Sequence, residues 1–149
     1  MSNSVRDAVR WICLSLLVGL VAGACNPSLE RDPNEDSGND GERSKAQILP
    51  LGEPVNDRVS YTEGDMTDWK YVQVPAAGTI NVTMGCDYPS AYCTVNIRDE
   101  VGLLLRELPS EGESRVSGSL AVTRGNYYLE IFVPASSTAY TIQVDYEPN

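Results

Sequence analysis

The chemistry open to this chain is limited first by a residue type that it lacks. Its 149 residues include no histidine, whereas Asp and Glu together number 21. Histidine is the commonest general base and a very common metal ligand, so Ser-His-Asp sets, Cys-His sets and His-containing zinc sites are excluded. Carboxylates remain, and they permit either a carboxylate-dependent hydrolase or the binding of a hard cation such as Ca²⁺.

Acidic and amide side chains gather between residues 53 and 68. The set is Glu53, Asn56, Asp57, Glu63, Asp65 and Asp68. Oxygen atoms on turns can hold Ca²⁺, and Asp57, Asp65 and Asp68 are the weak candidates for such a site. The set lacks the ligand spacing of a defined loop, and turns favour Asp and Asn for their backbone geometry alone. We therefore predict no metal centre and no catalytic residue, and keep Ca²⁺ as the only cofactor worth testing.

The first 24 residues have the pattern of an export signal. Arg6 and Arg10 give a positive start, residues 11–22 are uncharged and mostly apolar, and small residues follow. The apolar run is shorter than the roughly 20 residues that a membrane-spanning helix needs. A positive start, an apolar middle and a small-residue end are typical of a secretory signal peptide, which we place at residues 1–24.

The end of this run, Val21-Ala22-Gly23-Ala24-Cys25, resembles the lipobox of bacterial lipoproteins. In that family the cysteine is acylated and becomes the new N-terminus, so the resemblance implies a membrane anchor with palmitate-type chains on Cys25. The next residue is Asn26 rather than the Asp associated with inner-membrane retention, which favours the outer membrane. The expected location is therefore the cell envelope. The alternative is a plain signal peptide with a coincidental cysteine.

Residues 25–47 form a polar, acidic stretch. Apart from prolines, only Leu29 and Ala46 in residues 26–47 have apolar side chains, too few to offset the entropy of ordering. We predict a lipidated cysteine and a disordered tether over residues 25–47, followed by one domain over residues 48–149. The formal net charge of −10 argues against nucleic acid as a partner, because phosphate backbones would be repelled.

Two cysteines of the domain, Cys86 and Cys93, enclose a short segment that contains Tyr88 and Tyr92. In an exported protein such a pair is expected to form a disulfide, and the spacing is not that of a Cys-x-x-Cys redox site. The bond would stiffen the loop between two strands. The alternative interpretation makes Tyr88 and Tyr92 an aromatic contact site on that loop.

From residue 48 onward, short runs alternate apolar and polar side chains between turn signals. The expected strands are residues 58–61, 69–74, 79–84, 92–98, 103–107, 115–122, 127–133 and 140–146. About eight half-buried strands in about a hundred residues predict an all-β fold, an antiparallel β-sandwich of jelly-roll type.

The alternation also predicts which side chains face the core. The inward sets are Ile80, Val82 and Met84; Val95 and Ile97; Tyr127, Leu129, Ile131 and Val133; and Tyr140, Ile142 and Val144. Trp69, in a strand with Tyr71, is also expected in the core. Tyr128 and Phe132 alternate with the inward set, so we expect them to face outward as a candidate sugar or protein contact. The alternative is that this aromatic pair lies against a loop.

Four segments resemble, in order, motifs of bacterial pre-peptidase C-terminal domains. They are Asp68-Trp69-Lys70-Tyr71 with its later Gly78-Thr79 turn, Val95 to Gly102 with an Asp-x-x-Gly turn, Gly125-Asn126-Tyr127-Tyr128, and Tyr140 to Val144. The resemblance covers residues 48–147. It implies a jelly-roll β-sandwich, and in that family some domains bind polymers such as collagen or chitin and some bind calcium. No peptidase accompanies the domain in this chain.

Three functional hypotheses follow from these observations. The first is a non-catalytic envelope lipoprotein whose sandwich binds a protein or a polysaccharide. The second is a structural or assembly subunit of an envelope complex. The third, a carboxylate-dependent hydrolase, is disfavoured because no recognisable pair of catalytic carboxylates is present. We therefore expect that the protein is not an enzyme.

Overall fold

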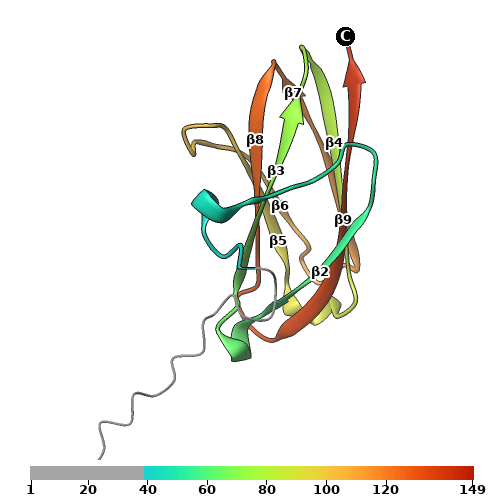
Figure 1. The fold of residues 1–149 in the computed structure, drawn as a ribbon. Helices are drawn as coiled ribbons and strands as arrows, with labels where there is room; N and C mark the ends of the chain where they lie inside the picture. The colour runs from blue at the N-terminus through green and yellow to red at the C-terminus, as the bar shows by residue number, and fades with distance from the viewer. Residues whose placement is uncertain (1–38) are drawn as a thin grey trace, which may run out of the picture. The chain divides into compact units, whose positions relative to one another are not determined.

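The computed structural model describes residues 39–149, which form two packed β-sheets (Figure 1). The strands are β1 (Gln47–Ile48), β2 (Val55–Ser60), β3 (Thr67–Val74), β4 (Gly78–Cys86), β5 (Thr94–Arg98), β6 (Leu104–Pro109), β7 (Arg115–Val122), β8 (Gly125–Phe132) and β9 (Ser137–Pro148). Three 3₁₀ turns accompany them: η1 (Arg43–Lys45), η2 (Tyr61–Glu63) and η3 (Pro89–Ala91). No α-helix occurs in this described part of the chain.

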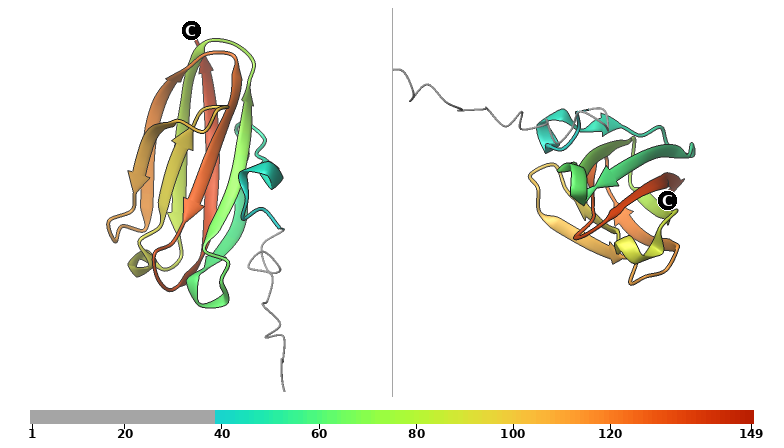
Figure 2. Two further views of the ribbon diagram at one scale, coloured as in Figure 1. Left: turned by 90° about the vertical axis from the view of Figure 1, so that its left-hand side faces the viewer. Right: turned by 90° about the horizontal axis from the view of Figure 1, so that it is seen from below.

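The strand order is that of a jelly roll. One sheet has the order β1-β3-β8-β5-β6 and the other β2-β9-β4-β7. From β2 to β9 the chain changes sheet at every connection except β5 to β6, and every pair of neighbouring strands is antiparallel except β1 with β3. Figure 2 shows the resulting two layers from the side and from below. The all-β, jelly-roll sandwich expected from the alternation is confirmed.

All eight expected strands are present, with ends that differ by a few residues. The structure adds only β1, which has two residues and is too short to produce an alternation in sequence. The inward sets predicted on β4, β5 and β9 are fully buried between the sheets, as are Leu129, Ile131 and Val133, whereas Tyr127 is only half-buried at the core margin. These two inner faces supply the hydrophobic energy of the fold.

The domain starts earlier than predicted. Residues 39–47 were expected to end a disordered tether, but the structure orders them: Asp40 is fully buried, η1 follows it, and Gln47 begins β1. The prediction was wrong because it counted only apolar side chains, and this segment is held by a buried ion pair and by backbone hydrogen bonds. The predicted signal peptide, the predicted lipidation site at Cys25 and the predicted tether up to residue 38 lie outside the described residues. Among those described, no helix is long and apolar enough to cross a membrane.

Candidate binding surface and a buried charge cluster

Strand β3 turns its charged residues inward and its aromatic residues outward. Lys70 and Asp68 are fully buried on the inner face, together with Val72 and Val74. Trp69 therefore lies on the outer face, where it is half-buried. The prediction that Trp69 belongs to the core was wrong, because hydrophobicity alone assigned the two faces of this strand. The inverted strand places a tryptophan on the outer face of the sheet.

Four aromatic residues share the outer face of the five-stranded sheet. Tyr71 is paired with Tyr128 across β3 and β8, and their ring centroids are 5.8 Å apart. Trp69 lies two residues before Tyr71 on the same face. Phe132 lies four residues after Tyr128 on β8, opposite Thr67. All four are half-buried. Tyr128 and Phe132 thus face outward as predicted, and the structure adds Trp69 and Tyr71 to form what we call the aromatic face.

Charged and amide groups border the aromatic face. The Arg98 guanidinium lies 6.0 Å from the Trp69 ring centroid and pairs with Glu130 at 2.7 Å. Asn96 also donates to Glu130, at 3.0 Å, and Arg43 lies 5.6 Å from the Tyr128 ring centroid. The two guanidinium groups lie over the rings, so the aromatic face combines ring surfaces with hydrogen-bonding groups, the composition expected of a surface that binds a polar ligand.

The loop between β4 and β5 presents two further tyrosines. Tyr88 is 50% exposed and Tyr92 is 54% exposed. The loop is held in place, because the backbone N–H of Tyr88 donates to Thr138 and that of Ala91 closes the η3 turn. Tyr92 has a φ of 55°, a left-handed conformation that is uncommon for an aromatic residue. Both tyrosines thus satisfy the exposure that the contact-site prediction requires, and their role stays a prediction.

Cys86 and Cys93 bring two buried thiols together at the base of this loop. They are free thiols in this structure, and the Cys93 thiol is hydrogen-bonded to Cys86. That bond lowers the pKa of Cys86, whereas the same bond and burial raise the pKa of Cys93. The proximity suits the predicted disulfide, which stays a prediction.

Protein isolated under oxidising conditions is expected to contain the Cys86–Cys93 disulfide. Reduction should then lower the free energy of unfolding by about 2–3 kcal/mol, because the cross-link restricts the unfolded chain. Denaturant melts with and without a reductant measure this difference, and a Cys86→Ala, Cys93→Ala double variant should show none. Two titratable thiols in the denatured, unreduced protein would contradict the prediction.

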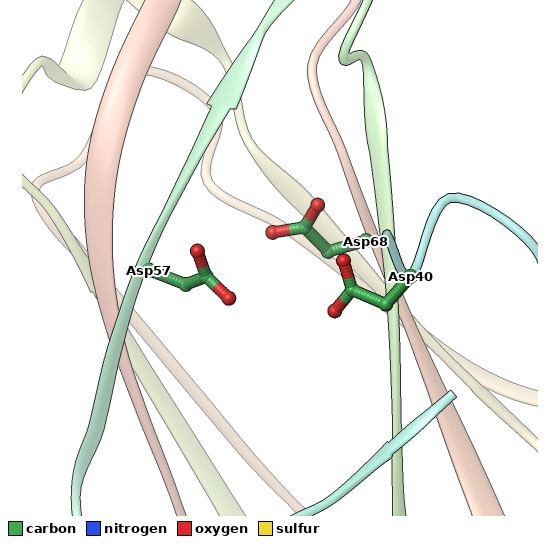
Figure 3. Close-up of side chains that lie close together, drawn as sticks. All are labelled: Asp40, Asp57 and Asp68. Carbon is green, nitrogen blue, oxygen red and sulfur yellow. The ribbon is translucent and has the colours of Figure 1, made fainter. Parts of the chain in front are cut away.

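A buried charge cluster lies on the inner side of β3, and Figure 3 shows its three aspartates, Asp40, Asp57 and Asp68. Carboxylate oxygens of Asp40, Asp57 and Asp68 all lie within 4.8 Å of one another. The Lys70 ammonium donates to Asp40 and to Asp57, each at 2.5 Å, and to Gln47 Oε1 at 3.2 Å. Lys70 therefore occupies the position between carboxylates that a metal ion would otherwise take.

Burial dominates the electrostatics of this cluster. It raises the pKa of Asp68 to about 8, and the hydrogen bond that Tyr140 donates to Asp68 at 2.6 Å opposes this only in part. Burial also raises the pKa of Asp40 and that of Tyr140. Burial disfavours the ammonium of Lys70, but its hydrogen bonds to Asp40 and Asp57 outweigh this and raise its pKa. Lys70 stays charged at neutral pH, while Asp68 is mostly protonated.

The Asp68→Asn variant is expected to change how stability depends on pH. Asp68 has an ordinary pKa of 3.8 and a folded pKa of about 8, so the folded state retains a proton that the unfolded state loses between these values. The stability from this proton is complete below pH 3.8 and is lost as the pH rises through 8. Unfolding free energies measured from pH 4 to 8 should therefore fall more steeply for the wild type than for Asp68→Asn. Asp87→Asn, at an exposed site, should keep the wild-type slope, and equal slopes for all three proteins would contradict the assignment.

The structure places two of the three predicted calcium candidates close together and the third elsewhere. Asp57 and Asp68 belong to the cluster, whereas Asp65 is buried elsewhere and its backbone oxygen accepts from the Ser60 N–H. Sequence reasoning missed Asp40, assigned to the tether, and Lys70, whose position in a strand with aromatic neighbours gave no sign of burial. With an ammonium already bound, the cluster's evident task is to fasten the segment around Asp40 to β2 and β3.

Comparison with solved structures agrees with the sequence resemblance in fold. The fold is similar to that of a pre-peptidase C-terminal domain. The match is to the domain of a collagenase from Bacillus anthracis, with a TM-score of 0.59 and 16% identity over 67% of this chain and 94% of that chain. At this identity the likeness concerns the fold alone.

Weaker likenesses extend to other proteins. A periplasmic inhibitor of g-type lysozyme from Aeromonas hydrophila matches with a TM-score of 0.49 and 10% identity, over 68% of this chain and 96% of that chain. A carbohydrate-binding module, CBM35 from Cellvibrio japonicus Abf62, matches with a TM-score of 0.37 and 9% identity, over 56% of this chain and 70% of that chain. No protein-family model and no curated protein matches the sequence.

Proposed function

We propose that this protein is a non-catalytic lipoprotein of the cell envelope that binds a polysaccharide through its aromatic face. The observation that carries the proposal is the outward placement of Trp69, Tyr71, Tyr128 and Phe132 on adjacent strands. Sugar rings have apolar faces that stack on aromatic side chains, and their hydroxyl groups need donors and acceptors beside the rings. Arg98, Glu130 and Asn96 supply such groups next to Trp69.

The chemistry of the described residues supports a binding role over catalysis. The three carboxylates that lie closest together are buried or nearly so, and a lysine is bound among them. A depression of about 430 Å³ on the described part is lined by Gln73, Val74, Pro75, Arg124, Gly125 and Asn126, without a carboxylate. A carboxylate-dependent hydrolase needs an acid and a base that both reach a substrate. The proposal therefore assigns no catalytic residue.

Retention assays on insoluble polymers test this function. The mature protein should sediment with at least one envelope-type or structural polysaccharide, such as peptidoglycan or chitin, and soluble fragments of that polymer should compete. Fibrous collagen serves as the protein comparison. Retention by collagen alone would favour a protein partner, and retention by no polymer would favour the assembly-subunit hypothesis.

A further inference from the structure

The turn between β5 and β6 exposes an apolar run. Val101 is 81% exposed, Leu103 is 62%, Leu104 is 43% and Leu105 is 38%. These four residues fall within five consecutive positions, interrupted only by Gly102. Single apolar side chains are common on protein surfaces, but a contiguous group of this kind marks a contact with another apolar phase.

The exposure is built into the fold. The Asp99 carboxylate accepts hydrogen bonds from the backbone N–H groups of Val101, at 3.0 Å, and Leu103, at 2.8 Å. Backbone bonds between Asp99 and both Gly102 and Leu103 close the turn. The pairing of β5 with β6 then shifts register between Ile97 and Arg98, which leaves Leu105 as an extra residue on β6. This defined turn holds its apolar side chains away from the core.

Three arginines lie beside this turn, and one of them, Arg98, is also paired with Glu130. Arg43 donates to the Glu100 carbonyl at 3.5 Å, and Arg98 donates to the Gly102 carbonyl at 3.2 Å. Arg124 lines a depression of about 180 Å³ together with Val101. Apolar tips bordered by cations suit a phospholipid surface, where apolar side chains enter the acyl boundary and arginines meet phosphates. The Asp99 carboxylate serves the turn itself, but exposed Glu100 disfavours a strongly anionic surface.

The path of the chain brings this turn within reach of a bilayer. Arg43, which touches the turn, lies four residues after the first described residue, Asn39. Thirteen residues separate Asn39 from Cys25. Even fully extended, this length of chain spans at most roughly 50 Å. A domain anchored at Cys25 therefore stays within this distance of the membrane, which lets the turn reach it.

We propose that the turn from Val101 to Leu105 is a second membrane contact that docks in the interfacial region of a zwitterionic phospholipid bilayer. This inference rests on the lipid-anchored location given under Proposed function. The contact fixes the orientation of the domain, because the edge strand β6 then faces the bilayer. Without this contact, the chain before Asn39 would be the only link between the domain and the membrane.

A quenching experiment on the lipidated, full-length mature protein tests the contact. A fluorophore is attached to Val101→Cys, or to Ser117→Cys as a matched exposed control on β7, and each protein is reconstituted in phosphatidylcholine vesicles. Aqueous iodide should quench the label at position 101 roughly fivefold less than the label at position 117. Adding Leu103→Glu and Leu104→Glu to the Val101→Cys protein should restore full quenching without releasing the protein from the vesicles.

Each outcome decides the matter. Equal quenching at both positions, with the protein still on the vesicles, overturns the docking and leaves the lipid anchor intact. Shielding that disappears when the protein is diluted in the lipid means that a second copy covers the turn, which also overturns the proposal. A mature protein that vesicles do not retain refutes the anchored location, and the docking inference falls with it. Polysaccharide retention is measured separately and does not depend on this result.

Discussion

Replacing Lys70 by methionine is expected to lower the free energy of unfolding by about 3–5 kcal/mol, because the change leaves buried carboxylates without their cation. Lys70 is fully buried and pairs with Asp40 and Asp57 at 2.5 Å. Methionine retains much of the volume, so the loss is mainly electrostatic. For a domain of this size, the melting temperature should fall by on the order of 15 °C.

Lys45→Met is the matched control for this prediction. Lys45 is 43% exposed and lies 3.9 Å from Glu42, so its loss should change stability by less than about 1 kcal/mol. If the Lys70→Met and Lys45→Met proteins had the same melting temperature, the buried cluster would contribute nothing to stability. A Lys70→Met protein that fails to fold would agree with the prediction, and Lys70→Arg then gives a measurable intermediate case.

The same variant tests the calcium hypothesis. In the wild type, the Lys70 ammonium competes with any cation for Asp40, Asp57 and Asp68, so millimolar Ca²⁺ should leave the melting temperature unchanged. In Lys70→Met, three carboxylate atoms within 4.8 Å of one another and the nearby Gln47 oxygen offer oxygen ligands. Ca²⁺ should raise the melting temperature of the variant, and EDTA should reverse the increase. A calcium-dependent increase in the wild type would show that a metal displaces the ammonium or binds elsewhere.

Trp69→Ala is expected to weaken polysaccharide binding by about 30-fold, corresponding to roughly 2 kcal/mol for a central aromatic contact. Trp69 lies under the Arg98 guanidinium and two residues from Tyr71 on the same face. Depletion isotherms on the polymer identified by the retention assay measure the change. Circular dichroism and the melting curve show that the fold is kept.

Tyr61→Ala is the matched control for Trp69→Ala. Tyr61 is 50% exposed in the η2 turn, which follows β2 of the four-stranded sheet, so its removal should leave binding unchanged. Tyr88→Ala and Tyr92→Ala report separately on the loop tip. Loss of binding in these two variants, with Trp69→Ala unaffected, would move the site from the sheet face to the loop.

The sequence predicted the fold well because most strands follow a simple rule. Ile80, Val82 and Met84 alternate with polar residues and are fully buried, and β7 has the bounds that its alternation predicts. Each of these assignments needs only local information, because one face of each strand meets the core. The jelly-roll order then follows from the number of strands and the resemblance in motifs.

The sequence failed where a distant partner decides the outcome. In β3, Trp69 and Tyr71 are the more hydrophobic face, yet Lys70 and Asp68 are buried because Asp40, Asp57 and Tyr140 provide their partners. The local sequence pattern does not indicate these partners, since Asp40 is 30 positions from Lys70. The early boundary of the domain was missed for the same reason. Tyr128 and Phe132 were placed correctly because their own strand alternates normally.

Fluorescence of Trp69 tests the central claim most directly. The chain has two tryptophans, Trp11 and Trp69, so cleavage of the proposed signal peptide at residues 1–24 would leave Trp69 as the one tryptophan of the mature protein. Titration with soluble fragments of the retained polysaccharide should shift or quench its emission, with a midpoint equal to the binding constant from depletion isotherms. Emission that stays unchanged while the fragments bind would contradict the assignment of binding to the aromatic face.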